Sequence, residues 1–262
     1  KELLEEVDLI IEKNNLQFVE HNVEEIIENN SISVKFNIFE GEKILVERIN
    51  ITGNNVTNES VIRGELNVDE GDPFTKLSIE KSVADLKSRN IFNIVNYEVL
   101  NGSEDNLKII NINVEEKPTG EISAGAGVGT NGGSVAINIS ENNWLGEGKR
   151  VDFSIEADAE SFGGILNYSD PNYTFLGNSI NYYLANESND KPTQGYENSI
   201  ISAGINTNFE QYKNLFTNLG VDLTFDDLRT DSSASSSLSK QSGEFLEFAG
   251  IYGFKYDGRD RS

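Results

Sequence analysis

In Val151-Asp152-Phe153-Ser154-Ile155-Glu156-Ala157-Asp158-Ala159-Glu160, every second residue is apolar and every residue between is polar. Because successive side chains of a β-strand point to opposite faces of its sheet, this period of two predicts a strand with one apolar and one polar face. A strand of this length, at about 3.3 Å per residue and a tilt of about 45°, spans roughly 23 Å, which matches the apolar band of an outer-membrane barrel.

The same alternation recurs on both sides of this stretch and gives eight predicted strands from Glu121 onward. A soluble sandwich would also alternate, but the polar face carries small or charged residues so consistently that a water-filled lumen is favoured. Aromatic residues at or near strand ends, where an interfacial girdle belongs, favour the barrel further: Trp144, Tyr173, Phe175, Tyr252 and Tyr256. No stretch approaches the 18 apolar residues of a transmembrane helix, and a transmembrane barrel needs none.

The first 118 residues mix helical and strand patterns. A strand, two helices and a hairpin are predicted in about 75 residues, a β-α-α-β-β unit. It begins with a strand over 44–52 and a short helix over 57–65, with Thr57 as the N-cap of that helix. A longer helix follows Gly71-Asp72-Pro73 and ends at Asn90. The last two strands lie around Val95–Val99 and Ile110–Val114. We expect Leu77, Val83 and Leu86 to share the apolar face of the longer helix.

A helix over 3–14 and strands near 18–27 and 31–38 resemble the last three elements of another copy of this unit. We therefore predict an α+β module, the end of a second one before it, and all-β antiparallel barrel strands after it. The expected domains are 1–43, 44–118 and 119–262. The chain begins without Met and ends directly after a predicted strand, so we expect a piece of a longer protein.

Composition and charge argue against several classes of function. The net charge of -23 is unsuited to a protein that neutralises phosphates, so no nucleic-acid partner is expected. With no Cys and a single His, His21, thiolate sites and histidine triads are excluded. We expect no enzyme activity, metal or cofactor.

Three patterns suggest chemistry and are better explained by structure. Gly127–Gly132 fits G-x-G-x-x-G, but a second strand follows where dinucleotide binding requires a helix, so a hairpin turn is predicted. Glu156, Asp158 and Glu160 belong to one long polar face rather than to a glycosidase pair. The acidic residues Asp222, Asp226, Asp227 and Asp231 do not have the spacing of a calcium loop.

The glycine-rich first barrel strand, Ser123-Ala124-Gly125-Ala126-Gly127-Val128-Gly129, has two explanations. Glycine on the lumen side makes room for an interior loop or relieves barrel curvature. Alternatively, glycine weakens the edge deliberately, so that the strand can open and accept a foreign strand by β-augmentation. The spacing alone does not decide between the two.

Several motifs resemble those of a known family. Four segments resemble parts of a POTRA domain: Val46–Asn54, Ser60–Arg63, Gly71–Phe74 and Ser88–Phe92. The next segment, Glu115–Gly120, resembles the junction of the last POTRA with a barrel. Three segments resemble the opening barrel strands of the BamA family of outer-membrane assembly factors: Gly125–Thr130, Asn143–Gly146 and Asp170–Phe175. The segment Tyr256–Arg261 resembles the end of that family's eighth strand.

The resemblance implies periplasmic POTRA repeats and a sixteen-stranded outer-membrane barrel that folds and inserts other barrel proteins. It also implies that the first strand pairs weakly with the last and receives the client's strand at that seam. The implied gate residues are Ile122, Ser123, Ala124, Gly125, Ala126, Gly127, Val128 and Gly129. Nascent chains or lipoproteins of an assembly complex would pair with a POTRA edge at Val95, Asn96, Tyr97, Glu98 and Val99. The implied partners also include outer-membrane lipid.

Three other functions are considered. TamA-like assembly factors and two-partner secretion channels share POTRA and barrel parts, and a passive porin would have no use for POTRA repeats. An insertase engages its client along the first barrel strand, whereas a channel engages lumen-facing residues such as Asp152, Glu156 and Asp158. The acidic lumen face would hinder the passage of acidic polypeptides, which counts against a general export channel.

Overall fold

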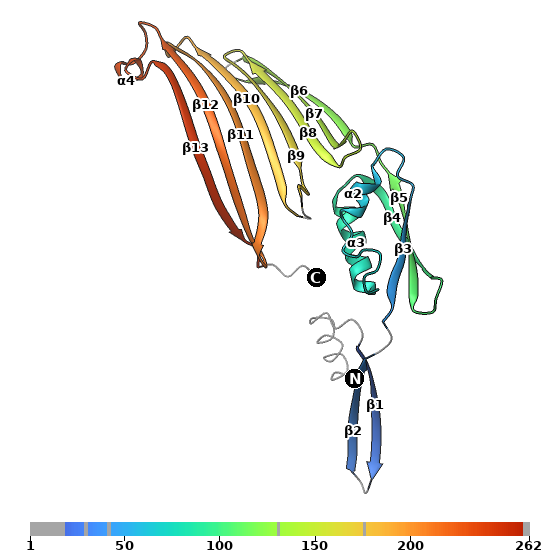
Figure 1. Ribbon diagram of the computed structural model, residues 1–262. Helices are drawn as coiled ribbons and strands as arrows, with labels where there is room; N and C mark the ends of the chain where they lie inside the picture. The colour runs from blue at the N-terminus through green and yellow to red at the C-terminus, as the bar shows by residue number, and fades with distance from the viewer. Residues whose placement is uncertain (1–18, 29–30, 41–42, 130–131, 175–176, 259–262) are drawn as a thin grey trace. The chain divides into compact units, whose positions relative to one another are not determined.

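The computed structural model describes residues 19–28, 31–40, 43–129, 132–174 and 177–258 (Figure 1). The chain divides into two compact units: Lys1–Asn55 with Glu65–Glu116, and Val56–Gly64 with Lys117–Ser262. The helix predicted over 3–14 lies outside the described residues. None of the helices in the described ranges is long and apolar enough to cross a membrane.

The described part of the first unit begins with a pair of strands. Strands β1 (Val19–Glu28) and β2 (Ser31–Glu40) pair antiparallel, with Glu28 opposite Ser31, as the alternation near these residues predicts. His21 lies in β1.

A three-stranded sheet and a helix follow. Strand β5 (Leu107–Glu116) lies in the centre, parallel to β3 (Leu45–Thr52) and antiparallel to β4 (Phe92–Asn101). Helix α3 (Lys76–Ser88) starts at Thr75, whose hydroxyl accepts a hydrogen bond from the Ser78 N–H at 3.1 Å. With helix α2 (Glu59–Arg63), the element order is the predicted β-α-α-β-β.

The apolar face of α3 differs from the prediction at one position. Val83 and Leu86 are buried as expected, but the third buried apolar residue of the helix is Ile79, and Leu77 is 49% exposed. Residues 79, 83 and 86 follow the spacing of three and four that places side chains on one face, whereas Leu77 precedes Ile79 by only two positions. The core of the unit also contains Val46, Ile49, Ile91, Val95, Ile110, Ile112 and Val114.

The second unit is an antiparallel sheet of eight strands within the described residues, and each strand pairs with its neighbours in the sequence (Figure 1). The sheet is open, with β6 and β13 at its edges. The strands are β6 (Gly120–Gly129), β7 (Gly132–Trp144), β8 (Lys149–Asp158), β9 (Ser161–Asp170), β10 (Ser179–Lys191), β11 (Tyr196–Tyr212), β12 (Leu215–Thr230) and β13 (Gly243–Tyr256). All eight were predicted from the period of two.

The register aligns like residues across the whole sheet, because directly paired residues lie on the same face. One row of the apolar face contains Ile139, Phe153, Leu166, Leu184, Ala203, Leu223 and Phe248. The adjoining row of the polar face contains Ser140, Asp152, Asn167, Tyr183, Gly204, Asp222 and Ala249. Phe153, Leu184 and Phe248 are exposed on the apolar face, as on a barrel wall that contacts lipid.

The turn between β7 and β8 explains the motif Asn143-Trp144-Leu145-Gly146. The Asn143 side chain accepts a hydrogen bond from the Gly148 N–H and donates one to the Thr57 hydroxyl, both at 2.8 Å. Thr57 lies in the same unit and is buried. The prediction that Thr57 is the N-cap of α2 is wrong, because the helix begins one residue later, at Glu59. The N-cap is Asn58, whose own N–H donates to the Gly146 carbonyl at 2.8 Å.

Candidate strand-pairing edges

Strand β6 is a free edge of the sheet. It pairs with β7 alone, from Gly120 opposite Glu141 to Gly129 opposite Gly132, and all ten of its residues are exposed. On its other side, no strand among the described residues pairs with its backbone N–H and C=O groups. Such an edge is a template for another strand.

The predicted gate residues all lie on this edge and divide between its faces. Ile122, Ala124, Ala126 and Val128 point to the apolar face, and Ser123, Gly125, Gly127 and Gly129 to the polar face. A Cβ at Gly125 or Gly129 would meet no described atom within 4 Å. Nothing in the described residues therefore requires glycine there for space, although each glycine weakens the strand by about 0.5–1 kcal/mol relative to Ala.

The three-stranded sheet of the first unit also has a free edge among the described residues. Strand β4, which contains the predicted residues Val95–Val99, pairs with β5 alone. The Asn96 and Glu98 side chains are exposed, whereas Val95 is buried in the core. A partner at this edge would therefore meet the backbone together with the two polar side chains.

The opposite edge of this sheet is covered, a feature that the sequence analysis missed. The Val46 N–H donates to the Asp72 carbonyl, the Phe74 N–H donates to the Ile44 carbonyl, and Leu45 forms a bridge with Pro73. The Glu70 carboxylate also accepts a hydrogen bond from the Ile49 N–H at 3.0 Å. The motif Gly71-Asp72-Pro73-Phe74 thus shields β3 and leaves β4 as the accessible edge.

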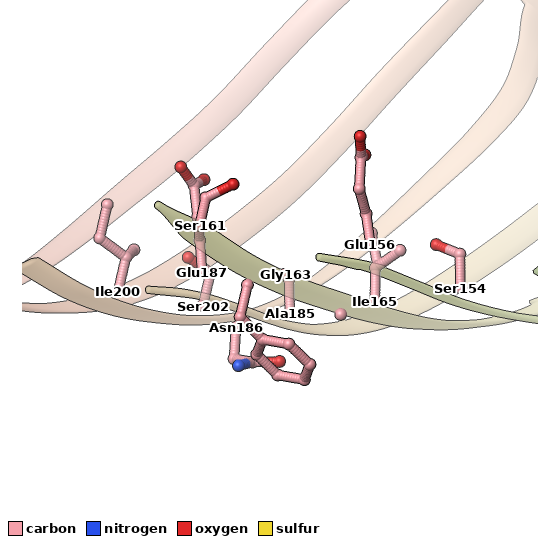
Figure 2. A pocket seen from close by; sticks show the side chains of 12 residues that line it. Ser154, Glu156, Ser161, Gly163, Ile165, Ala185, Asn186, Glu187, Ile200 and Ser202 are labelled. Carbon is pink, nitrogen blue, oxygen red and sulfur yellow. The ribbon is translucent and has the colours of Figure 1, made fainter. Parts of the chain in front are cut away.

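The polar face of the large sheet contains a pocket of about 500 Å³ (Figure 2). Glu156 on β8 and Glu187 on β10 lie on either side of Gly163, which pairs directly with both. Figure 2 shows both carboxylates on one side of the sheet and Asn186 on the other. Asp152 and Asp158, which were predicted with Glu156 to meet a passing chain, both accept hydrogen bonds: Asp152 accepts two from Arg150 at 2.7 and 2.8 Å, and Asp158 accepts one from the Glu160 N–H at 2.7 Å.

The acidic residues near the end of β12 are separated by their contacts. Asp222 lies on the polar face and is hydrogen-bonded to Tyr183, Asp227 pairs with Arg229, and Asp231 accepts hydrogen bonds from Ser233. Across the described part of the chain, no group of three or more His, Cys, Asp or Glu residues could hold a metal ion.

Two family models match the chain. Residues 44–117 match POTRA, described as a surface antigen variable number repeat, and residues 143–262 match the Omp85 superfamily domain. The first match covers the β-α-α-β-β unit, and the second covers the sheet from the end of β7 onward.

Curated relatives are outer-membrane assembly factors. The chain is 26% identical to the outer membrane protein assembly factor BamA of Neisseria meningitidis serogroup B over 74% of its length, and 31% identical to that of Buchnera aphidicola over 65%. It covers only 23% and 30% of these proteins.

Solved structures share the fold. BamA from Haemophilus ducreyi lacking POTRA domains 1–3 has a TM-score of 0.67 and 20% identity, with 98% of this chain and 54% of that chain covered. CdiB from Escherichia coli has a TM-score of 0.50 and 12% identity, with 91% and 46% covered.

These findings confirm the predicted fold class and location. The chain combines a periplasmic POTRA domain with strands β6–β13 of an outer-membrane barrel. The apolar face of the sheet is accordingly the face toward lipid, and the polar face is the face toward the lumen.

Proposed function

We propose that this protein is an assembly factor that folds and inserts outer-membrane β-barrel proteins by β-augmentation at β6. The observation that carries the proposal is the glycine-rich polar face of β6, where Gly125, Gly127 and Gly129 follow one another and neither Gly125 nor Gly129 has a described atom within 4 Å of an added Cβ. The names of the curated relatives support the same activity.

The geometry suggests how the edge would work. A client strand aligned antiparallel to β6 would form main-chain hydrogen bonds with the unpaired side of the strand, which are independent of the client's sequence. Gly125, Gly127 and Gly129 together lower the strand's own pairing energy by about 1.5–3 kcal/mol relative to Ala. A weak native pairing at this edge is more easily exchanged for a client strand.

The POTRA domain would contribute a second pairing edge. We propose that β4, at Val95, Asn96, Tyr97, Glu98 and Val99, receives nascent outer-membrane proteins or lipoproteins of an assembly complex. The cover over β3 supports this choice of edge, because β4 is the strand of this sheet with an uncovered side among the described residues. Photo-crosslinkers at Asn96 and Glu98, whose side chains are exposed, should trap these partners. Absence of any adduct there would remove β4 from the mechanism.

The test of the main proposal places a photo-crosslinker at single positions from Ile122 to Gly129 in the full-length protein during assembly of an outer-membrane protein. Asp152 and Glu156, on the lumen face, are the controls. Adducts in strand register along β6 with the client's C-terminal strand are expected. Adducts confined to the two control positions would contradict the proposal.

The second candidate is a polypeptide secretion channel. The lumen-face residues Asp152, Glu156 and Asp158 favour it, because a passing chain would meet them. Adducts at the control positions alone would support this function. We rank the channel second to the assembly factor, of either the BamA or the TamA type, because the acidic lumen face would hinder the passage of acidic polypeptides.

A further inference from the structure

A lysine lies at the periplasmic end of the lipid face of the large sheet. Lys149 is the first residue of β8 and lies on the same face as Val151 and Phe153. This end is the periplasmic one, because β6 begins directly after the POTRA domain at Gly120 and the antiparallel β7 returns to the same end. Strands β7, β8 and β9 each pair with a strand on both sides, so the surroundings of Lys149 are complete within this sheet.

Aromatic side chains surround Lys149 on this face. Trp144 on β7 pairs directly with Lys149 and is 44% exposed. Tyr168 on β9 is hydrogen-bonded to the Lys149 ammonium, and the centre of its ring lies 6.1 Å from that of Tyr182. Because tryptophan and tyrosine are enriched where a barrel wall meets the headgroup layer, these rings place the Lys149 ammonium at the depth of lipid headgroups.

Lys149 and Glu147 form an ion pair with unused hydrogen-bonding capacity. Lys149 Nζ lies 2.7 Å from Glu147 Oε2, and the two side chains are 27% and 47% exposed. An ammonium has three N–H donors, of which Glu147 and Tyr168 take two. Within the described residues, the third Lys149 donor and the Glu147 Oε1 atom have no protein partner. The pair thus offers a cationic donor beside an anionic acceptor.

The surrounding charge determines which headgroup fits this pair. Glu141 and Asp170, the other charged residues at this end of the lipid face of β7–β9, are both acidic. Together with Glu147 they set three carboxylates against the single Lys149 ammonium. A lipid that carries only an anionic phosphate would meet net repulsion here. A lipid whose phosphate is joined to a primary ammonium would place each of its charges beside the opposite one.

We propose that Trp144, Glu147, Lys149 and Tyr168 form a binding site for the headgroup of a zwitterionic phospholipid with a primary ammonium, phosphatidylethanolamine, in the periplasmic leaflet. The lipid phosphate accepts a hydrogen bond from the third Lys149 donor, and the lipid ammonium donates one to Glu147 Oε1. The aromatic rings pack beside the glycerol and the first part of the acyl chains. The bound lipid would fix the depth of the β7–β8 turn in the membrane.

The experiment measures lipid binding to the full-length protein by native mass spectrometry. Phosphatidylethanolamine, phosphatidylglycerol and phosphatidylcholine are titrated separately into the detergent-solubilised protein. Phosphatidylglycerol has no ammonium, and the trimethylated ammonium of phosphatidylcholine cannot donate a hydrogen bond to a carboxylate. We expect the first phosphatidylethanolamine to bind with a Kd about three- to tenfold lower than either of the other lipids. Equal Kd values for the three lipids would overturn the proposal.

Two substitutions separate the roles of the charges. Lys149→Gln removes the cation and should raise the Kd for phosphatidylethanolamine by about three- to tenfold. Glu147→Gln removes the carboxylate that repels an anionic headgroup, and should bring the Kd for phosphatidylglycerol within about twofold of that for phosphatidylethanolamine. Persistence of the full preference in Glu147→Gln would contradict the assignment of the ammonium to Glu147.

The matched control is Lys191→Gln at the extracellular end of β10. Lys191 forms a similar ion pair with Glu160, at 2.8 Å and with side chains 22% and 26% exposed. This substitution should leave the Kd values for all three lipids unchanged. An increase as large as that in Lys149→Gln would overturn the site, because any exposed lysine would then account for the binding.

Heat-modifiable gel mobility verifies that each variant folds as a barrel. The comparison of the three lipids on the unaltered protein needs no substitution, so it decides the proposal even where a variant does not fold.

Discussion

Arg89 Nε lies 3.1 Å from the Glu65 carboxylate oxygen Oε1, and the two side chains are only 13% and 5% exposed. This ion pair gives the motif Ser88-Arg89-Asn90-Ile91-Phe92 a structural meaning. Arg89 pairs with Glu65, Asn90 takes a left-handed conformation with φ of 57° at the end of α3, and Ile91 and Phe92 enter the core. The motif therefore joins the end of the helix to the start of β4.

Arg89→Ala should destabilise the POTRA domain by about 3–5 kcal/mol, because it leaves the buried Glu65 carboxylate without its counter-charge. Hydrogen–deuterium exchange of β5 peptides in the full-length protein measures the loss. The control is Arg63→Ala, which removes an exposed pair with Glu59 at 2.7 Å and should cost at most about 0.5 kcal/mol. Equal exchange in the two variants would contradict a structural role for the buried pair.

Gly204→Ala should destabilise the barrel by about 1–3 kcal/mol, because the new methyl group would overlap the Tyr183 ring and the Asp222 carboxylate. Gly250→Ala on β13 is the control, since a Cβ there meets nothing within 4 Å. Urea unfolding of the full-length protein in lipid vesicles compares the two. A loss for Gly250→Ala as large as that for Gly204→Ala would show that the effect arises from strand glycines in general.

Gly146→Ala should cost more than Gly177→Ala, although both glycines have positive φ, 75° and 80°. Both substitutions introduce the left-handed strain of about 1 kcal/mol. Only at Gly146 would the new Cβ also collide with a backbone carbonyl, that of Val56, whereas nothing lies within 4 Å at Gly177. The melting temperatures of the two variants test this, and equal values would mean that the carbonyl moves aside without cost.

The loop after β12 should lose local order in acid. The Ser233 hydroxyl and N–H both donate to Asp231 Oδ1 at 2.6 Å, and these bonds lower the pKa of Asp231 below its ordinary value of 3.8. Because the folded pKa is the lower one, the stabilisation is complete above the unfolded pKa and is lost as the pH falls through the folded pKa.

Amide exchange of the loop, corrected for its intrinsic rate, is therefore expected to accelerate as the pH falls below the ordinary carboxyl pKa of 3.8. Asp231→Asn, which cannot titrate, should show no such dependence. The same acceleration in that variant would assign the effect to another group.

The sequence by itself determined the elements and their order. An alternation of period two is local, so it predicted β6–β13 and both of their faces, and spacings of three and four predicted α3. Two predictions about the helices were wrong, because contacts with residues distant in the sequence determine the burial of Leu77 and the role of Thr57. Leu77 is apolar yet exposed, and Thr57 resembles an N-cap yet binds Asn143, a residue 86 positions away.

Only the tertiary structure decided which edges are covered and which glycines are closely packed. The segment over β3 covers one POTRA edge, whereas β4 keeps its free edge among the described residues. The Tyr183 ring packs against Gly204, whereas no described atom lies within 4 Å of a Cβ at Gly125. These differences depend on what lies opposite each residue across the sheet. Local periodicity cannot predict these differences, because strand pairing joins residues that are distant in the chain.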